Sequence, residues 1–547
     1  MKTRYSAIPP ASNHASVRVG IACSRSTDHT FYSSILESID ECGHASIVAK
    51  IELQTEQQDY EHITTNRSFL ARWFERFDRF YKATLIAAHR ETCAQVLRDI
   101  PNVEHDRAGA LTEVTRKQLA DLDLDLIIQC DRDVCVKLAA FAKFGIWTFE
   151  FLNRAGATQT KSALYRALDT ELISRIGLFA NAGTCSKPLL LGRTVARKQQ
   201  ALSLVSIMEA EGNAASVLLI WELWKLNRPG AKTTPHHAMA SRKPSTHSPI
   251  DSVESSTKLA RQISGRLSSK LLRAIKSAKP REWRIGLRAA SDDEPWASSW
   301  NGFTWIDARE GHYLADPFLF RHQQNYWLFA EDYISEAQKG VLNCAPVSDD
   351  GVVGQWTTIL EFPYHLSFPL VFENDGEIFM VPESSAGGSV ELYRANEFPY
   401  AWSKVRTLWA GPGLDTVPFR AADGIWYFFT SVQSHKDAPP QLLLFTAKEL
   451  HAEWQLHPAN PLSLDVRYSR NGGRILEMPT DNGTSMLVRV SQDGSGNYGS
   501  KLHFHQIELL TPENYRERLI SSRYPPAEND GSHHYDRCDR WEVMDIS

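Results

Sequence analysis

The second half of the chain repeats one pattern three times at a spacing of about fifty residues. The segments ADPFLF, SFPLVF and VPFRAA each place a proline at the start of an apolar run, and Pro317, Pro369 and Pro418 lie 52 and 49 residues apart. A second apolar run follows each time: YWLFAED, EIFMVPESS and IWYFFTSVQ. Several short strands per unit at this period are typical of a β-propeller, whose four-stranded blades stack around a central channel. The pattern predicts a propeller with its functional site at that channel.

Length and charge limit the remaining possibilities. A chain of 547 residues is too long for one core and indicates two or three domains. The net charge of −5 gives no general electrostatic case for binding nucleic acid. The eight cysteines are scattered, with no CxxC pair and no histidine at zinc-site spacing, so we predict no metal and no cofactor. No run of signal-peptide or membrane-spanning length is evident, and we expect a cytoplasmic protein.

The first half of the chain alternates apolar runs with helical patterns. After a start (1–16) that we expect to be disordered, the runs VRVGIA, SIVAKIEL, LDLDLIIQC and FGIWTFEF read as buried strands. Strands that alternate with helices favour a parallel, Rossmann-like α/β sheet. We therefore predict an α/β domain over residues 17–226.

The composition then shifts, which indicates a linker over residues 227–282. Proline, serine, threonine, histidine and lysine dominate its first part, and few of these side chains could drive burial. Its second part, Ser256 to Arg281, carries eight basic residues, no acid, and apolar residues every four positions. Two interpretations stay open for this basic helix: peripheral contact with anionic lipid, or packing between domains. A propeller (283–520) and a C-terminal tail (521–547) complete the predicted organisation.

Blade geometry predicts which side chains meet at the channel. The start of a blade's first strand and the end of its second strand share one rim, because the two strands are antiparallel. The residues placed at this mouth are Asp316, Glu331, Asp332, His365, Glu383, Ser384 and Asp415, with Arg489 and Gln492 from a fourth unit. Carboxylates and a guanidinium suit sugar hydroxyls, and an acid and a base about 6.5 to 9.5 Å apart could cleave a glycosidic bond with inversion.

Longer segments of the same region resemble a known family. HLSFPLVFENDGEIFMVPESS (365–385), LYRANEFPYAW (392–402), SRNGGRIL (469–476) and RVSQDGSGNYG (489–499) are similar to the five-bladed propellers of family 43 glycosidases. More closely, they resemble the N-terminal domain of plant glucosamine inositolphosphorylceramide transferases and its bacterial relatives. The resemblance implies five blades and a carbohydrate ligand. We see no second glycosyltransferase domain in this chain, so we expect that the plant transferase activity does not carry over.

The resemblance also implies roles for individual acids. Family 43 enzymes use a base in the first blade, a second-blade aspartate that tunes pKa, and a third-blade glutamate as proton donor. Asp316 matches the base, the second role falls on Phe368, and the third falls on Thr416 with Asp415 one residue away. We therefore predict Asp316 and Glu383 as a central catalytic pair supported by Asp415. A site that binds without hydrolysis is the alternative.

The α/β domain resembles the formyltransferase fold in its strand order. Formyltransferases carry an asparagine, a histidine and a downstream aspartate for acyl transfer. Here Glu150 and Phe151 stand where the histidine is expected, Asn153 follows, and the later segment 176–189 offers no aspartate. Acyl transfer needs an oriented base and an oxyanion stabiliser, so the resemblance implies the fold and the departures argue against the activity.

Three functions follow from these observations. The first is a carbohydrate-active protein whose propeller mouth binds a glycan or glycolipid intermediate in surface polysaccharide biosynthesis, with its processing by a glycosidase-like or glycosyl-transfer activity left open. The second is a non-catalytic glycan-binding scaffold, and the third is an amino-sugar formyltransferase with a recognition propeller. The expected partner is a glycan or glycolipid in each case, with peripheral membrane contact through 256–281 as a further expectation.

Overall fold

The computed structural model divides the chain into two compact units, 1–276 with 434–439, and 277–433 with 440–547. The residues it describes are 8, 16–24, 29–53, 76, 78–80, 82–104, 111–130, 136–159, 166, 171–182, 188–198, 203–228, 282–290, 300–434, 438–480, 485–496, 498–526 and 530–547. The predicted basic helix (256–281) and nearly all of the linker and of the N-terminal start lie outside them. Both interpretations of that helix therefore stay predictions.

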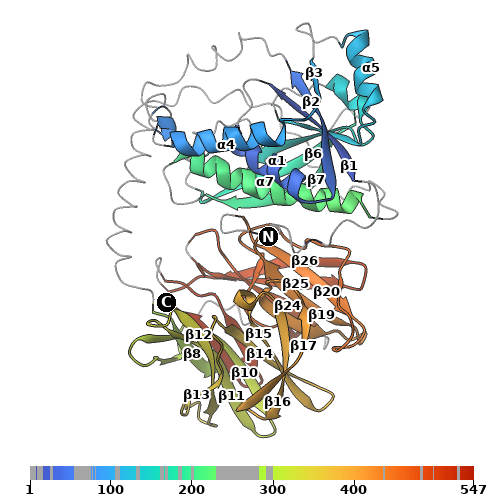
Figure 1. Ribbon diagram of the computed structural model, residues 1–547. Coiled ribbons are helices and arrows are strands. Elements are labelled where there is room, and N and C mark those ends of the chain that lie inside the picture. Colours follow the sequence, from blue (N-terminus) through green and yellow to red (C-terminus); the bar gives the residue numbers. More distant parts are fainter. Residues whose placement is uncertain are drawn as a thin grey trace. The chain divides into compact units, whose positions relative to one another are not determined.

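The first unit is an α/β domain on one seven-stranded sheet with the order β3-β2-β1-β4-β5-β6-β7 (Figure 1). Its strands are β1 (Val17–Ser24), β2 (Ala45–Leu53), β3 (Asn102–Glu104), β4 (Leu126–Gln129), β5 (Ile146–Leu152), β6 (Ile173–Asn181) and β7 (Leu189–Arg197). Neighbours from β3 to β5 are parallel, whereas β6 and β7 are antiparallel additions. The expected sheet was parallel throughout. The connection from Asn181 to Leu189 is too short for the crossover of a dozen or more residues that parallel strands need.

Three helices pack together in this unit, α1 (His29–Glu41), α4 (Ala83–Val96) and α7 (Leu204–Leu226), while α5 (Glu113–Asp121) contacts β3 (Figure 1). A short 3-10 helix, η1 (Val136–Phe141), follows β4. Helix α7 has the length and hydropathy of a membrane span, which the sequence prediction did not anticipate. Because 83% of its most apolar window is buried within the fold, its apolar character is that of a core helix.

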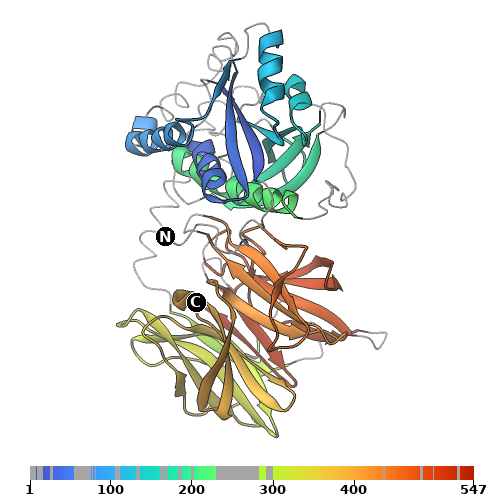
Figure 2. The same ribbon diagram turned by 45° about the vertical axis from the view of Figure 1, so that its right-hand side comes forward.

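The second unit is a five-bladed β-propeller (Figure 2). Blade one holds β10 (His312–His322), β11 (Asn325–Ile334), β12 (Lys339–Val347) and β13 (Thr357–Leu360). Blade two holds β14 (Ser367–Asn374), β15 (Glu377–Glu383), η2 (Ser385–Gly387), β16 (Val390–Glu397) and β17 (Ala401–Trp409). Blade three holds β18 (Leu414–Arg420), β19 (Trp426–Val432), β20 (Gln441–Ala447) and β21 (Gln455–Leu456). The predicted proline-led runs are the first strands of these three blades.

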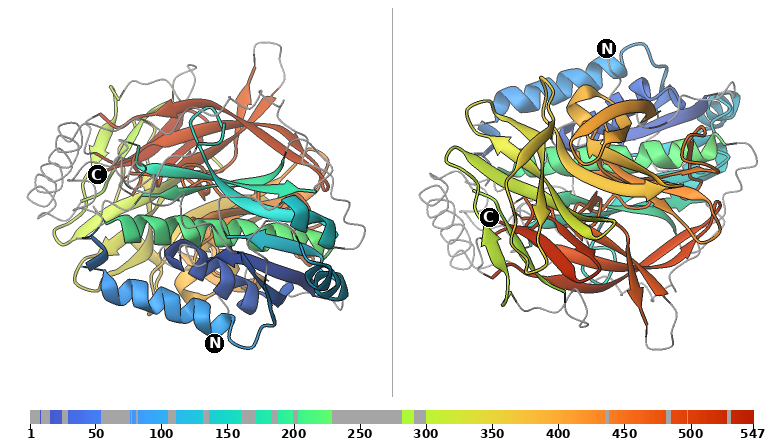
Figure 3. Two further views of the ribbon diagram at one scale, coloured as in Figure 1. Left: turned by 90° about the horizontal axis from the view of Figure 1, so that it is seen from above. Right: turned by 90° about the horizontal axis from the view of Figure 1, so that it is seen from below.

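The remaining two blades complete the propeller (Figure 3). Blade four holds β22 (Arg470–Asn471), β23 (Leu476–Pro479), β24 (Ser485–Gln492), β25 (Leu502–Leu510) and β26 (Tyr515–Arg523). Blade five combines both ends of the unit: β27 (Tyr535–Cys538), β28 (Trp541–Ile546), β8 (Arg284–Ala289) and β9 (Thr304–Ile306).

The mixed origin of blade five corrects one prediction. The strands β8 and β9, from the start of the unit, help to close the ring. Residues 521–547 were expected to form a tail, but β28 pairs with β8 along its whole length, from Trp541 opposite Ala289 to Ile546 opposite Arg284. The physical reason is that β8 would otherwise present an unpaired edge inside the molecule.

Candidate functional site

A cavity of about 260 Å³ opens at one end of the propeller channel. It is lined by Trp283, Tyr313, Ala315, Asp316, Glu331, His365, Ser367, Glu383, Arg470, Tyr498 and His533. The volume lies just below the range of about 300 to 1,000 Å³ that is typical of small-molecule pockets. It therefore suits a group of roughly one sugar ring. Four predicted residues meet there: Asp316, Glu331, His365 and Glu383.

A β-bulge positions the acidic residues of the first strands. In blade one Ala315 faces Glu331 and Phe318 faces Phe329, so two residues of β10 oppose one residue of β11. The same irregularity recurs in blades two and three. Asp316, Phe368 and Asp415 occupy the equivalent bulge position, with φ of 50°, 50° and 47°. The structure thus aligns Asp415 with Asp316, whereas the family resemblance had placed the third role on Thr416.

Asp316 is held by two histidines from the segment before β27. Its Oδ1 lies 3.3 Å from Nε2 of His533 and 3.5 Å from Nδ1 of His534. Burial alone would raise the pKa of the Asp316 carboxyl, but the charge of His533 and the contacts with both rings lower that pKa well below its usual range. Asp316 is therefore an ionised carboxylate at neutral pH.

His533 is in turn paired with Asp545 at the end of β28. Its Nδ1 lies 2.8 Å from Oδ2 of Asp545. Burial opposes the charged form, yet the two carboxylates, Asp545 and Asp316, raise the pKa of His533 to about 10. The backbone N–H groups of His533, His534 and Asp316 also donate to Asp545, at 2.8, 2.9 and 3.3 Å. Asp545 thus fixes both the charge and the position of His533.

Glu383 lies in a different environment. Burial, and then the charge of Asp415, raise the pKa of the Glu383 carboxyl to about 8, while Arg470 partly offsets them. Arg470 is committed to Asp415 through two hydrogen bonds, from Nε at 2.7 Å and from an Nη at 2.9 Å, and lies 3.7 Å from Oε2 of Glu383. Ser385 donates to the other oxygen, Oε1, at 3.0 Å. Glu383 therefore carries a proton at neutral pH.

Glu331 is the third carboxyl group of the cavity, and His365 faces it. Nδ1 of His365 accepts a hydrogen bond from the backbone N–H of Gly340 at 2.9 Å, which leaves Nε2 toward Glu331 at 3.7 Å. Burial lowers the pKa of His365, so the ring is neutral at pH 7 even though Asp316 favours the charged form. Burial and the charge of Asp316 raise the pKa of Glu331 well above its usual range.

Aromatic rings form part of the cavity wall. The ring centroids of Trp283 and Tyr498 lie 4.2 and 5.0 Å from that of His533. Tyr313 stacks on Tyr333 at 4.5 Å, with an interplanar angle of 9°. Rings beside carboxylates offer an apolar surface for the C–H face of a sugar and acceptors for its hydroxyl groups.

Other predicted mouth residues do not line the cavity. Arg489 is fully buried and pairs with Glu517 at 2.7 and 2.8 Å, because it lies three residues before the mouth end of β24 and points to the opposite face from Gln492. Gln492 stands behind the site and donates to Asp415 at 3.2 Å. Ser384 donates to the carbonyl of Ser389 in the turn after β15. These residues support the blades.

Asp332 also has a structural position. Its carboxylate contacts Nδ1 of His312 at 2.7 Å and accepts from the side chain of Asn343 at 2.9 Å. It follows Glu331 directly, and successive residues of a strand point to opposite faces. Glu331 therefore faces the cavity and Asp332 does not.

The site residues that sequence reasoning missed are mostly in blade five and its neighbours. His533 and Asp545 fell in the presumed tail, and Arg470 and Tyr498 lie in segments that were noted only for their family resemblance. One signal was available: WEVMDI places Asp545 next to its last residue, much as YWLFAED ends in Glu331 and Asp332. Reading it as a second strand would have placed Asp545 at the mouth.

Asp316, His533 and Asp545 lie close enough together to be considered as metal ligands. The direct His533–Asp316 and His533–Asp545 contacts account for their closeness, so we assign no metal to them.

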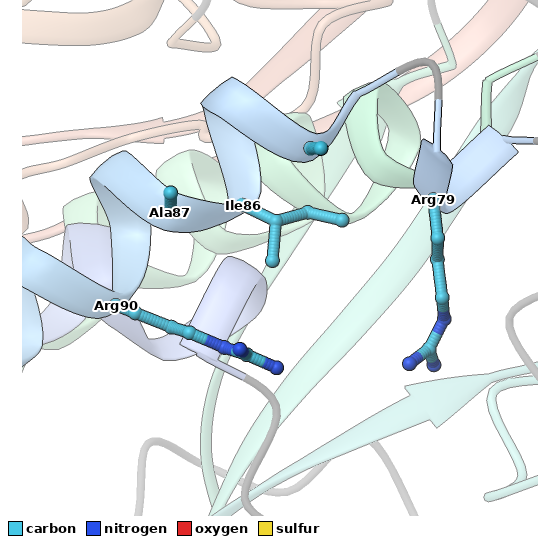
Figure 4. Close-up of a pocket in the computed structure, with 5 residues that line it drawn as sticks. Arg79, Ile86, Ala87 and Arg90 are labelled. Carbon is cyan, nitrogen blue, oxygen red and sulfur yellow. The ribbon is translucent and has the colours of Figure 1, made fainter.

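The first unit offers less chemistry. A hollow of about 380 Å³ on α4 and the residues before it is lined by Arg79, Ala83, Ile86, Ala87 and Arg90 (Figure 4). These five residues include no acid and no nucleophile. In the segment compared with formyltransferases, Oδ1 of Asn153 accepts from the backbone N–H of Ala157 at 3.0 Å, as a turn residue does, and Glu150 lies within β5.

Comparisons with known proteins concern the propeller. Residues 306–545 match the family model described as glucosamine inositolphosphorylceramide transferase 1, N-terminal. Over 211 residues the chain is 31% identical to a protein of Oryza sativa subsp. japonica and 33% identical to one of Arabidopsis thaliana, both described as glucosamine inositolphosphorylceramide transferase 1. Each alignment covers 38% of this chain, and it covers 28% and 27% of those two proteins. The predicted plant resemblance is confirmed for the propeller, and these matches give no support to bacterial relatives.

Solved structures align with low scores. An exo-β-1,3-galactanase from Clostridium thermocellum has a TM-score of 0.33 at 13% identity, covering 47% of this chain and 65% of that chain. A family 43 protein from Bacillus licheniformis has a TM-score of 0.31 at 13% identity, covering 46% and 58%. A phosphoribosylglycinamide formyltransferase from Anaplasma phagocytophilum has 0.25 at 14% identity, covering 38% and 88%. Scores this low carry no argument, so the propeller assignment rests on the five sheets themselves.

Proposed function

We propose that the propeller mouth binds a glycan or glycolipid intermediate of surface polysaccharide biosynthesis and acts on one of its glycosidic bonds. The observation that carries this proposal is that two carboxyl groups in one cavity have opposite protonation states. Asp316 is held ionised by His533 and His534, while Glu383, with a pKa of about 8, keeps its proton at neutral pH. Two titratable groups whose environments push their pKa values apart are suited to act as base and acid.

Each group then has a definite task. Asp316 would take the proton of a water or an acceptor hydroxyl group, and Glu383 would donate its proton to the leaving oxygen. Arg470 would hold Asp415 and keep Glu383 in place, and the Trp283 and Tyr498 rings would support the sugar. The plant relatives are described as glucosamine inositolphosphorylceramide transferases, which supports a glycolipid as the partner.

A non-catalytic glycan-binding site is the second candidate, and one observation favours it. Phe368 fills the bulge position of blade two that corresponds to Asp316, and it is buried against Phe318 at 4.8 Å. No carboxylate therefore enters the cavity from that position. In this case the same residues would bind the glycan without turnover.

Two variants separate the two candidates. Asp316→Asn and Glu383→Gln should each reduce turnover of a furanoside or hexosaminide by roughly a hundredfold or more, because each removes one proton-transfer group. Binding should weaken far less. Turnover and affinity are measured together on the full chain. The control is Glu377→Gln, at an exposed position of β15. Unchanged turnover in both variants contradicts the catalytic assignment, and affinity that is unchanged in both without any turnover places the site elsewhere.

The remaining expectations stay proposals. We infer no formyl transfer by the α/β domain, in keeping with the turn role of Asn153. A cytoplasmic location with peripheral membrane contact would fit a glycolipid partner.

A further inference from the structure

Glu331 is the carboxyl group at the mouth whose own contacts are least complete. Its residue is 5% exposed, it lines the cavity, and among the described residues Oε1 has no hydrogen-bond partner. The nearest ring nitrogen, Nε2 of His365, is 3.7 Å away, beyond hydrogen-bond distance. A buried carboxyl oxygen without a donor costs stability unless something else supplies that donor.

The wall beside Glu331 at Gly340 has no room for a further side chain. A side chain at Gly340 would meet Oε1 of Glu331 at 2.6 Å and the carbonyl of Leu366 at 2.3 Å, so the wall on that side is closed. The carboxyl group is thus confined against Gly340 and borders the cavity. A molecule bound in the cavity can supply this donor.

The charges around the cavity favour a positively charged donor. Five carboxyl groups gather there, on Asp316, Glu331, Glu383, Asp415 and Asp545. Arg470 is committed to Asp415, and His533 is shared by Asp316 and Asp545. Glu331 and Glu383 are left without a full cationic partner of their own.

We propose that the mouth binds a sugar that carries a free ammonium group, and that Glu331 accepts the hydrogen bond of that ammonium. This inference rests on the proposed glycan-binding function and specifies its ligand class. The ammonium supplies both the missing donor and the missing positive charge, and a charge-assisted hydrogen bond of this kind is stronger than a neutral one. A neutral hydroxyl group would supply the hydrogen-bond donor but not the positive charge.

Binding should then be coupled to proton release. Without a bound cation, burial and the anionic neighbours of Glu331 favour its protonated form, because they raise its pKa. The groups that face it are Asp316, Glu383, Asp545, His533, His365 and Tyr313. An ammonium ion restores the ionised form, so the Glu331 proton leaves for solvent when the amine binds.

Titration calorimetry on the full chain tests this with glucosamine, glucose and N-acetylglucosamine. We expect glucosamine to bind at least roughly tenfold more tightly than either neutral sugar near pH 7. Titrations in two buffers of different ionisation enthalpy should show about one proton released per glucosamine and none per glucose. Glu331→Gln should remove the preference and the proton release, whereas Glu377→Gln, an exposed carboxylate of β15, should keep both.

The outcomes separate the two proposals. Equal affinity for glucosamine and glucose overturns the ammonium inference and leaves glycan binding in place. A preference that persists in Glu331→Gln overturns the role of Glu331. Proton release is measured on the unmodified protein, so its absence with glucosamine contradicts the inference even if the variant does not fold. Binding of none of a wide panel of sugars overturns the proposed function itself.

Discussion

At the scale of single residues, the mouth keeps two chemically identical groups in opposite states. Asp316 is ionised because two histidines contact it, and Glu383 is protonated because it is buried and lies near the charge of Asp415. Arg470 could have ionised Glu383, but it gives both of its hydrogen bonds to Asp415. Because Arg470 is bonded to Asp415, Glu383 is the carboxyl group that keeps its proton and can act as the acid.

The state of Glu383 predicts a pH dependence of stability. Its pKa is about 8 in the folded protein against 4.5 ordinarily, so the folded form holds this proton more tightly than the unfolded chain does. The resulting stability is present in full below pH 4.5 and is lost as the pH rises through 8. Glu383→Gln cannot ionise. As the pH rises from about 5 to 8.5, we expect the free energy of unfolding of the variant to increase relative to that of the wild type, by up to a few kcal/mol.

Urea denaturation of both proteins at several pH values measures this gap. Glu377→Gln, at an exposed position of β15, should run parallel to the wild type. Parallel profiles for Glu383→Gln as well would mean that Glu383 titrates normally in the fold.

Residue roles were predictable from the sequence only in part. Asp316, Glu331, His365 and Glu383 could be placed at the mouth because strand ends of successive blades share a rim. The partners that set their charges could not. His533 reaches Asp316 through ring closure by residues more than two hundred positions away in the chain, and no local pattern encodes that contact.

At the scale of elements, the closure of the ring explains why the mouth exists at all. Blade five joins β27 and β28 from the end of the chain to β8 and β9 from the start of the propeller. Asp536 extends this closure, since it accepts from the backbone N–H of Leu319 at 2.8 Å and pairs with Arg474. Repeated proline-led runs predicted blades one to three, but blade five lacks the repeat. Its second-strand pattern was therefore assigned to a tail.

Removal of residues 535–547 tests this closure. The deletion exposes the edge of β8 and takes away Asp536 and Asp545, which anchor blade one. We expect the propeller to lose its cooperative thermal transition and to become sensitive to protease, because an open ring leaves hydrophobic faces of two blades uncovered. Asp545→Asn is the milder comparison, since it keeps the strand and weakens only the histidine pairing. A truncated protein with the wild-type melting temperature would show that β27 and β28 are dispensable.

At the scale of the whole molecule, the chain consists of two units with separate cores. One hydrophobic cluster, which contains Ile51 and Ile127, lies in the α/β domain, and two that contain Phe318 and Val488 lie in the propeller. This two-part organisation was predictable, because the strand-helix alternation of the first half and the fifty-residue repeat of the second belong to different fold classes. The antiparallel addition of β6 and β7 was not anticipated, since short connections leave only a weak signal in composition.

Separate cores predict that the propeller folds and binds without the α/β domain. A fragment of residues 277–547 contains all five blades and every residue that lines the mouth. We expect it to unfold cooperatively and to bind amino sugars with the affinity of the full chain within about threefold, since no cavity residue comes from the other unit. Thermal unfolding and calorimetry on the fragment and the full chain give both quantities. Asp316→Asn in the fragment should weaken binding as it does in the full chain. A folded fragment that has lost binding would show that the first unit takes part in ligand recognition, and a fragment that does not fold would show that the two cores depend on one another.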